Sequence, residues 1–209
     1  MMKLLLIRHG MTKGNLEHRY VGSTDEGLLP EEKDRLREMR LPGGLKIEKV
    51  FISPMLRCRD TLECLFPEVV SDNEEIVVRD FREMEFGDFE YMNYKEINED
   101  SDPEHKAAYQ RYIDSMGESP FPGGESKSEF TERVVSAFEK EVIAVIRNSS
   151  KSAFALVVHG GTIMALMDKY SEPHKDYFDW GLKPGQGYEA EISLDSEGEI
   201  RFKKVKMWS

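Results

Sequence analysis

The sequence has few cysteines and no long apolar runs. Cys58 and Cys64 are its only cysteines, too few for a disulfide framework and without the spacing of a zinc finger. This usage is typical of a reducing compartment, so we expect a cytoplasmic protein. No segment approaches the roughly 20 apolar residues that cross a bilayer, and the apolar run near the N-terminus stops at Arg8, too early for a secretory signal. We therefore expect no membrane partner.

The chain also lacks an excess of positive charge. Its 29 Lys and Arg residues stand against 40 Asp and Glu residues, for a formal net charge of −11. Without a surplus of cations to displace the counterions of DNA or RNA, nucleic-acid binding is not expected. A local basic pocket for one small anion is still compatible with this composition. The sequence carries no signal for an oligomeric state.

The length of 209 residues suits a single domain (1–209) whose core needs no disulfide or metal. Four short apolar runs without clean alternation predict strands that are covered on both faces. Helical patterns separate these runs, and the alternation predicts a layered α/β/α fold around a mostly parallel sheet. The predicted strands span 3–7, 49–52, 75–78 and 154–158.

Capping signals indicate where the helices begin. Pro30 lies near the start of the first predicted helix. Ser53 is the expected N-cap of the second helix, with Pro54 as its first residue. The longest helix is predicted to begin after Ser126, which has capping-box spacing to Glu129.

Two further segments have distinct patterns. Residues 90–124 are rich in charge, Tyr and Asn, and they predict an insertion of one or two short helices that caps the active site. Near the C-terminus, residues 187–205 predict a β-hairpin that turns at 195–199.

Cationic and nucleophilic side chains follow the predicted strands. Arg8 and His9 follow the first strand, Arg57 lies in the first turn of the helix after the second, and His159 follows the last. In open α/β sheets, ligands bind beyond these carboxyl ends. Arginine forks bind phosphate oxygens bidentately, helix N-termini offer free N–H groups, and a neutral imidazole can attack phosphorus. The sequence therefore predicts a phosphoryl site.

These motifs resemble those of the histidine phosphatase superfamily, in its phosphoglycerate-mutase-like branch. The resemblance covers nearly the whole chain, and its layout is most similar to the α-ribazole phosphatases. It is carried by RHG (8–10), SPMLRCRDT (53–61), REMEFGDFE (82–90) and HGG (159–161), in that order, with FPGGESKSEFTERV (121–134) and GQGYEAEI (185–192) for the layout.

The resemblance implies a role for each site residue. His9 would be the nucleophile that becomes phosphorylated. Glu83 would protonate the leaving alkoxide and later deprotonate the attacking water. His159 would help to clamp the phosphoryl oxygens. No metal or cofactor is implied, because arginines and histidines already supply positive charge. The expected phosphate-binding residues are Arg8, Arg57, Thr12, Asn15 and Gly160.

Other interpretations of the histidines and of Arg57 are open at this stage. His9 and His159 could be core residues, or could join Glu83 in a facial metal triad. Two arginines in the same pocket would repel a cation, which disfavours the metal. Arg57 could be a solvated charge on its helix, but its place in the first turn favours the pocket.

Several single residues also have two interpretations. Glu85 and Glu90 compete with Glu83 for the role of acid. Cys58 could be a redox-sensitive thiol, although its place on a core stripe favours packing. Asn15 could bind phosphate or form a turn. Aromatic candidates for the pocket mouth are Tyr91, Tyr94, Tyr109, Tyr112 and Trp180.

Three functions are compatible with this site: a phosphomonoesterase, a phosphoglycerate-type mutase and a non-enzymatic phospho-ligand sensor. Met84 follows Glu83 where the mutases of this branch carry a basic residue, and the insertion is short, so hydrolysis is favoured. A sensor could lose a histidine or the acid, and this chain keeps them all. The sequence lacks a P-loop and a GxSxG elbow. We expect hydrolysis of a small phosphorylated metabolite, with α-ribazole 5′-phosphate as a candidate.

Overall fold

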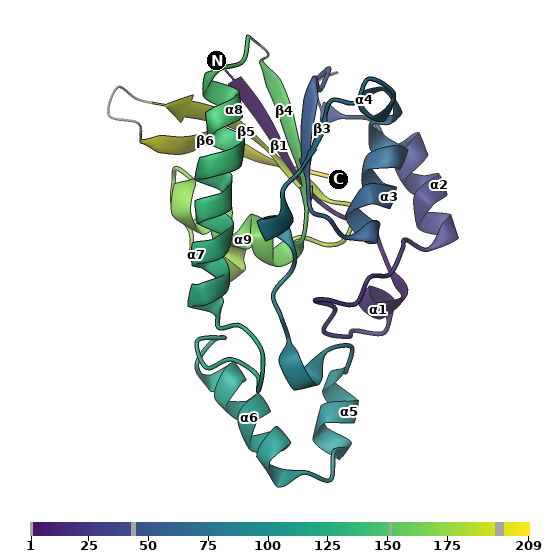
Figure 1. The fold of residues 1–209 in the computed structure, drawn as a ribbon, viewed down its shortest axis with the longest axis vertical. Coiled ribbons are helices and arrows are strands. Elements are labelled where there is room, and N and C mark those ends of the chain that lie inside the picture. Colours follow the sequence, from purple (N-terminus) through teal and green to yellow (C-terminus); the bar gives the residue numbers. More distant parts are fainter. Residues whose placement is uncertain (1, 43–44, 151, 195–198) are drawn as a thin grey trace.

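The computed structural model describes residues 2–42, 45–150, 152–194 and 199–209, and its centre is a six-stranded sheet (Figure 1). The four predicted strands and the late hairpin are confirmed. The turn predicted at 195–199 lies almost entirely outside the described residues. The strands are β1 (Met2–Arg8), β2 (Lys49–Ile52), β3 (Glu75–Val77), β4 (Ala153–Val158), β5 (Gly187–Leu194) and β6 (Ile200–Trp208).

The sheet is mostly parallel, as predicted. Its strand order is β3-β2-β4-β1-β5-β6. The pairs β3–β2, β2–β4 and β4–β1 are parallel, and β5 and β6 add two antiparallel pairs at one edge. The carboxyl ends of the four parallel strands therefore meet at one edge of the sheet.

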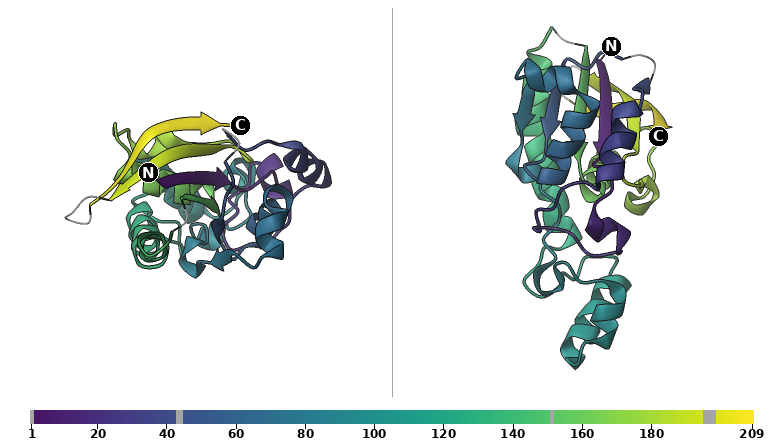
Figure 2. Two further views of the ribbon diagram at one scale, coloured as in Figure 1. Left: turned by 90° about the horizontal axis from the view of Figure 1, so that it is seen from above. Right: turned by 90° about the vertical axis from the view of Figure 1, so that its right-hand side faces the viewer.

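Successive side chains of β1 point to opposite faces of the sheet and so belong to two separate core layers. Leu4 and Leu6 belong to the cluster that contains residues of α7 (Lys127–Ala137) and α9 (Gly160–Tyr170). Leu5 and Ile7 belong to the cluster that contains α3 (Leu56–Leu65) and α4 (Pro67–Ser71), and α2 (Pro30–Glu38) packs on α3. Helices thus cover both faces, which confirms the layered α/β/α fold (Figures 1 and 2). Among the described helices, none is long and apolar enough to cross a membrane.

The longest helix begins where it was predicted. The Ser126 hydroxyl accepts from the Glu129 N–H at 3.2 Å, and a Glu129 carboxylate oxygen accepts from the Ser126 N–H at 2.9 Å. The helix continues through a π-helical segment (Phe138–Ile143) into α8 (Ala144–Arg147). Apolar residues at helical spacing along it, 130, 134, 138 and 142, are buried.

The predicted start of the second helix is wrong. α3 begins at Leu56, and neither Ser53 nor Pro54 caps it. The carboxylate of Asp25 instead accepts from the Leu56 N–H at 2.6 Å, so a side chain from a distant loop satisfies this free donor. The Ser53 hydroxyl is thereby available for a contact in the site.

Two short helices form in residues 90–124, within the predicted number. They are α5 (Tyr94–Glu99) and α6 (Pro103–Asp114), and they extend beyond the carboxyl ends of the parallel strands (Figures 1 and 2). A separate aromatic cluster holds this segment together, with Phe89 and Phe121 at its centre. The short α1 (Lys13–Leu16) lies at the same end of the molecule.

Candidate active site

Two histidines meet where the parallel strands end. The His9 N–H donates to the Val158 carbonyl at 2.9 Å, and the Ser53 N–H donates to the Val157 carbonyl at 3.2 Å. These bonds extend the backbone pairing of β1 and of β2 with β4 by one residue, and His159 directly follows β4. The imidazoles of His9 and His159 consequently lie edge to face, with ring centroids 5.2 Å apart.

The His9 ring has a defined tautomer. Its Nδ1 lies 2.8 Å from the Gly10 carbonyl, which can only accept, so Nδ1 carries the proton. The other nitrogen, Nε2, then keeps its lone pair. Burial lowers the pKa of His9 well below 6.5, and the charges of Arg57 and Arg8 lower it further. His9 is therefore a neutral imidazole, the form that acts as a nucleophile.

The His159 ring is held from both sides. The Nε–H of Arg57 donates to its Nδ1 at 3.3 Å, so the proton of the neutral ring resides on Nε2, which donates to the Ser53 hydroxyl at 2.7 Å. Burial lowers the pKa of His159 well below 6.5, and electrostatic repulsion from Arg57 and His9 lowers it further. Sequence reasoning missed this role of Ser53. The signal available was that Ser53 and His159 follow neighbouring strands.

Arg57 is completely buried, so the interpretation as a solvated helix charge is wrong. Its guanidinium donates to the carbonyls of Thr24 at 2.8 Å and Gly22 at 3.0 Å, and less closely to Val21. The opposite side of this loop is held by Glu90, whose carboxylate accepts from the N–H groups of Gly22 at 3.0 Å and Thr24 at 2.9 Å. Glu90 thus binds the loop that orients Arg57.

Arg8 has a donor without a protein partner. One terminal nitrogen donates to the Leu182 carbonyl, but the Nε of Arg8 is buried and makes no hydrogen bond to any residue that the structure describes. Burial lowers the pKa of Arg8, with a further contribution from the charge of Arg57. Buried donors are normally paired. This free donor of Arg8, near the charge of the buried Arg57, is compatible with the predicted anion site.

Glu83 faces the same space as Arg8. Burial raises its pKa, although a hydrogen bond from the Met84 N–H at 2.9 Å and the nearby arginines act in the other direction. Gly161 provides the room for this carboxylate, since an added Cβ would lie 2.6 Å from Oε1 of Glu83. Glu85 is exposed and pairs with a neighbouring arginine. Of the three candidate acids, Glu83 alone lines the adjacent cavity.

Thr12 and Asn15 lie at the start of α1. The Thr12 hydroxyl accepts from the Asn15 N–H at 3.2 Å, and the Asn15 side chain accepts from the Thr12 N–H at 3.4 Å. This capping box occupies both side chains, and neither residue lines the cavity beside Arg8. A contact with phosphate stays a prediction for both.

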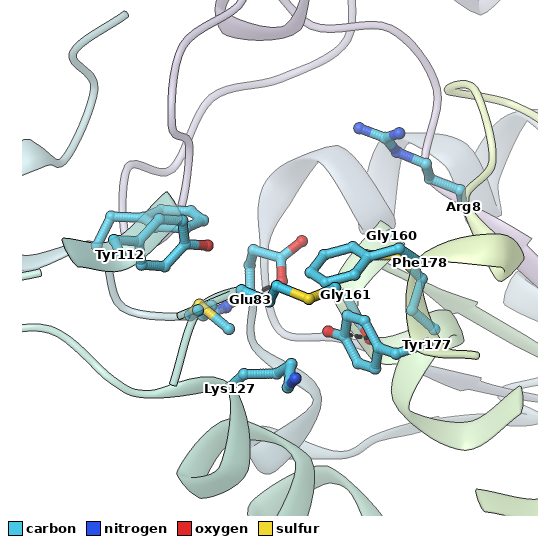
Figure 3. Close-up of a pocket in the computed structure, with 13 residues that line it drawn as sticks. Arg8, Glu83, Tyr112, Lys127, Gly160, Gly161, Tyr177 and Phe178 are labelled. Carbon is cyan, nitrogen blue, oxygen red and sulfur yellow. Dashed lines mark hydrogen bonds between the residues drawn. The ribbon is translucent and has the colours of Figure 1, made fainter. Parts of the chain in front are cut away.

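A cavity of ≈200 Å³ opens beside the carboxylate of Glu83 (Figure 3). His9, Arg57 and His159 do not line it and are almost completely buried. Of the five aromatic residues expected at the mouth, only Tyr112 lines the cavity, and the aromatic pair at 177–178 was not foreseen. The other lining residues are Arg8, Met84, Phe86, Met116, Gly117, Lys127, Gly160, Gly161, Met164, Tyr177 and Phe178.

The remaining sulfur and metal interpretations find little support. Burial raises the pKa of Cys58 to about 12, which keeps its thiol protonated and unreactive. Its Sγ lies 3.8 Å from Nε2 of His159, so it packs against the site. Within the described ranges, no three His, Cys, Asp or Glu side chains are grouped to hold a metal ion.

The fold and the site together define an α/β protein in which two neutral histidines and two arginines lie together where the parallel strands end. Comparison with known proteins agrees. Residues 4–198 match the family model of the histidine phosphatase superfamily (branch 1). The chain therefore belongs to the histidine phosphatase superfamily, and it is an enzyme of the histidine phosphatase type.

Individual relatives differ in their named activities. A 2,3-bisphosphoglycerate-dependent phosphoglycerate mutase of Parvibaculum lavamentivorans is 27% identical and covers 97% of this chain and 95% of its own. A broad-specificity phosphatase of Saccharomyces cerevisiae is 28% identical over 79% of this chain and 69% of its own. The alpha-ribazole phosphatase structure from Shigella flexneri shares the fold, with a TM-score of 0.71, 20% identity, and coverage of 97% of this chain and 95% of its own.

Proposed function

We propose that this protein is a phosphomonoester hydrolase that acts through a phosphohistidine intermediate on a small phosphorylated metabolite. The observation that carries the proposal is the state of His9. Its Nδ1–H is bound to the Gly10 carbonyl, its lowered pKa keeps the ring neutral, and Nε2 is left as the nucleophile beside the half-buried Arg8 and the buried Arg57. The acid Glu83 completes the set.

In the first step, Nε2 of His9 attacks phosphorus and forms an N–P bond while the ester P–O bond breaks. Glu83 gives its proton to the departing alkoxide. The Gly10 carbonyl stabilises the positive charge that develops on the imidazole. Arg8 and Arg57 stabilise the negative oxygens of the transition state, and groups of this kind are worth about 3–4 kcal/mol each.

In the second step, the ionised Glu83 removes a proton from water, and the oxygen of that water attacks phosphorus. The N–P bond breaks, inorganic phosphate leaves, and His9 is again neutral. The raised pKa of Glu83 suits both tasks, because an acid and base works best with a pKa near the working pH. A bound phosphate dianion raises that pKa further.

The lining of the cavity supports hydrolysis over phosphoryl transfer within a sugar acid. A mutase must hold the carboxylate of its substrate with extra cations. Apart from Arg8, Lys127 is the only cationic residue among the lining residues, and its ammonium is already paired with Glu118 at 2.9 Å. The complete catalytic set in turn favours an enzyme over a sensor.

Three finer parts of the proposal have their own support. Residues 90–124 act as a cap, since they contribute Tyr112, Met116 and Gly117 to the cavity. α-Ribazole 5′-phosphate is a candidate substrate, because related structures carry that activity in their names. The two cysteines are unpaired, which suits the reducing cytoplasm.

Turnover of an aryl phosphate and of 3-phosphoglycerate tests the hydrolase. We expect release of inorganic phosphate from the aryl ester, abolished by His9→Ala and retained by His174→Ala, since His174 is exposed and does not line the cavity. Conversion of 3-phosphoglycerate to its isomer without release of phosphate would instead identify a mutase.

A further inference from the structure

The cavity beside Glu83 has aromatic walls on two sides. Tyr112 lies on one side of the Glu83 carboxylate, and Tyr177 and Phe178 lie on the other (Figure 3). The Tyr112 ring is fixed by stacking on Phe121, with centroids 4.1 Å apart. Tyr177 and Phe178 form an edge-to-face pair at 5.0 Å. The walls are therefore supported rings from two separate segments.

Two apolar side chains of this cavity are unusually exposed. Met116 is 58% exposed and Phe178 is 49% exposed. Burying apolar surface is favourable by about 25 cal/mol per Å², and ligand cavities are typically apolar with a few polar groups that set orientation. A bound apolar group would cover both side chains while Glu83 and Arg8 face the ester. The cavity of ≈200 Å³ also exceeds the roughly 150 Å³ that accommodates benzene in an engineered protein.

The charge at the cavity rim is neutralised. The Lys127 ammonium lies 2.9 Å from a Glu118 oxygen and within 5.9 Å of the Tyr177 and Phe178 ring centroids. Glu118 is fixed in turn, because its other oxygen accepts from the Ser128 hydroxyl at 2.6 Å. The rim consequently offers rings to a ligand, and no free cation to a second anionic group.

We propose that this cavity is a leaving-group subsite for a flat, uncharged aromatic or heteroaromatic group joined to the phosphate through an alkyl oxygen. The inference rests on the hydrolase function proposed above. Tyr112 and Phe178 determine specificity by contacting the faces and edges of that ring. In this geometry, aromatic pairs contribute more binding free energy than their buried area alone would give.

Matched esters separate ring recognition from chemistry. 2-(2-Naphthyl)ethyl phosphate and n-butyl phosphate both release primary alkoxides, so their chemical steps are alike. We expect kcat/KM to favour the naphthyl ester at least tenfold. Phe178→Ala and Tyr112→Ala should each reduce this preference about fivefold to tenfold, and Phe178→Trp should retain it.

A control variant and a binding measurement complete the test. Ile113 neighbours Tyr112 on α6, is exposed and does not line the cavity, so Ile113→Ala should leave the preference unchanged. Calorimetric binding of both esters to His9→Ala reports the subsite without turnover. A preference in binding without release of phosphate from either ester by the native enzyme would refute the hydrolase and leave the subsite standing.

Two results would overturn the subsite. One is release of phosphate from both esters with equal kcat/KM and equal binding, which would leave the hydrolase intact. The other is tighter binding of 3-phosphoglycerate than of the naphthyl ester, because it would show that the rim supplies a free cation after all.

Discussion

The carboxylate of Glu83 occupies the space that the missing side chain of Gly161 leaves beside it. A Cβ at position 161 would lie 2.6 Å from Oε1 of Glu83 and 3.0 Å from the Phe130 ring. At Gly160 a Cβ would lie 3.5 Å from the Arg8 guanidinium, an ordinary contact. Gly161→Ala should therefore displace the acid and lower kcat for an alkyl phosphate about tenfold to 100-fold. Gly160→Ala should lower kcat much less. Equal losses of kcat in the two variants would contradict the role of Gly161 in making room for Glu83.

Glu83→Gln tests the acid directly. The amide cannot protonate a leaving alkoxide, whereas a phenolate leaves with little help. We expect a loss of about 100-fold or more in kcat for an alkyl phosphate and a much smaller loss for p-nitrophenyl phosphate. An equal loss for both esters, measured by phosphate release, would remove Glu83 from this role.

Glu90 should act on catalysis through Arg57. Its carboxylate holds the N–H groups of Gly22 and Thr24, while Arg57 binds the carbonyls of the same two residues. Glu90→Ala releases the loop, and small misplacements of catalytic groups are costly, so kcat should fall about tenfold with little change in KM. Glu90→Gln keeps an acceptor and should restore most of the activity. A lower melting temperature with unchanged kcat would mean that Glu90 is merely structural.

Folding stability should decrease in mildly acidic solution because of the buried histidines. Burial and Arg57 hold the pKa of His9 and of His159 well below 6.5. As pH falls through 6.5, the unfolded chain takes up protons at these positions and the folded protein does not. The free energy of unfolding should then fall by at most about 1.4 kcal/mol per pH unit for each histidine between pH 6.5 and about 5.5.

Urea unfolding of Glu83→Gln at several pH values measures this dependence, because the raised pKa of Glu83 would change the free energy of unfolding in the opposite direction. His159→Gln cannot titrate and should roughly halve the slope. The pKa of His105 is raised by its hydrogen bond to Asp100. Its effect on the pH dependence of the free energy of unfolding therefore lies above pH 6.5, outside the range in which the buried histidines act. A flat profile below pH 6.5 would contradict the neutral state of the pair.

The sequence predicted the fold well because its core elements are locally encoded. The apolar runs at 3–7 and 154–158 can be satisfied only by burial, and the parallel arrangement places the residues after each run at one edge of the sheet. The start of α3 was mispredicted because its cap comes from Asp25, more than one element away in the chain. Such a tertiary cap leaves no local signal around Ser53.

The site was predicted where motifs follow strands, and missed where side chains arrive from loops. His9, Arg57 and His159 converge because β1, β2 and β4 are neighbours in the sheet. Phe178 and Lys127 reach the cavity through a 3₁₀ turn and the start of α7, whose directions depend on packing elsewhere. The spacing of residues in the sequence therefore does not predict that these two side chains line the same cavity.

The central claim is that the phosphoryl group resides on His9 between the two steps. Rapid quenching of the enzyme during turnover of an aryl phosphate, followed by peptide mass spectrometry under alkaline conditions, tests it most directly. We predict a phosphorylated peptide that contains position 9, lost on acid treatment and more abundant in Glu83→Gln, where dephosphorylation is slowed. Full turnover with no phosphorylated His9, or with the phosphoryl group on another residue, would contradict the account.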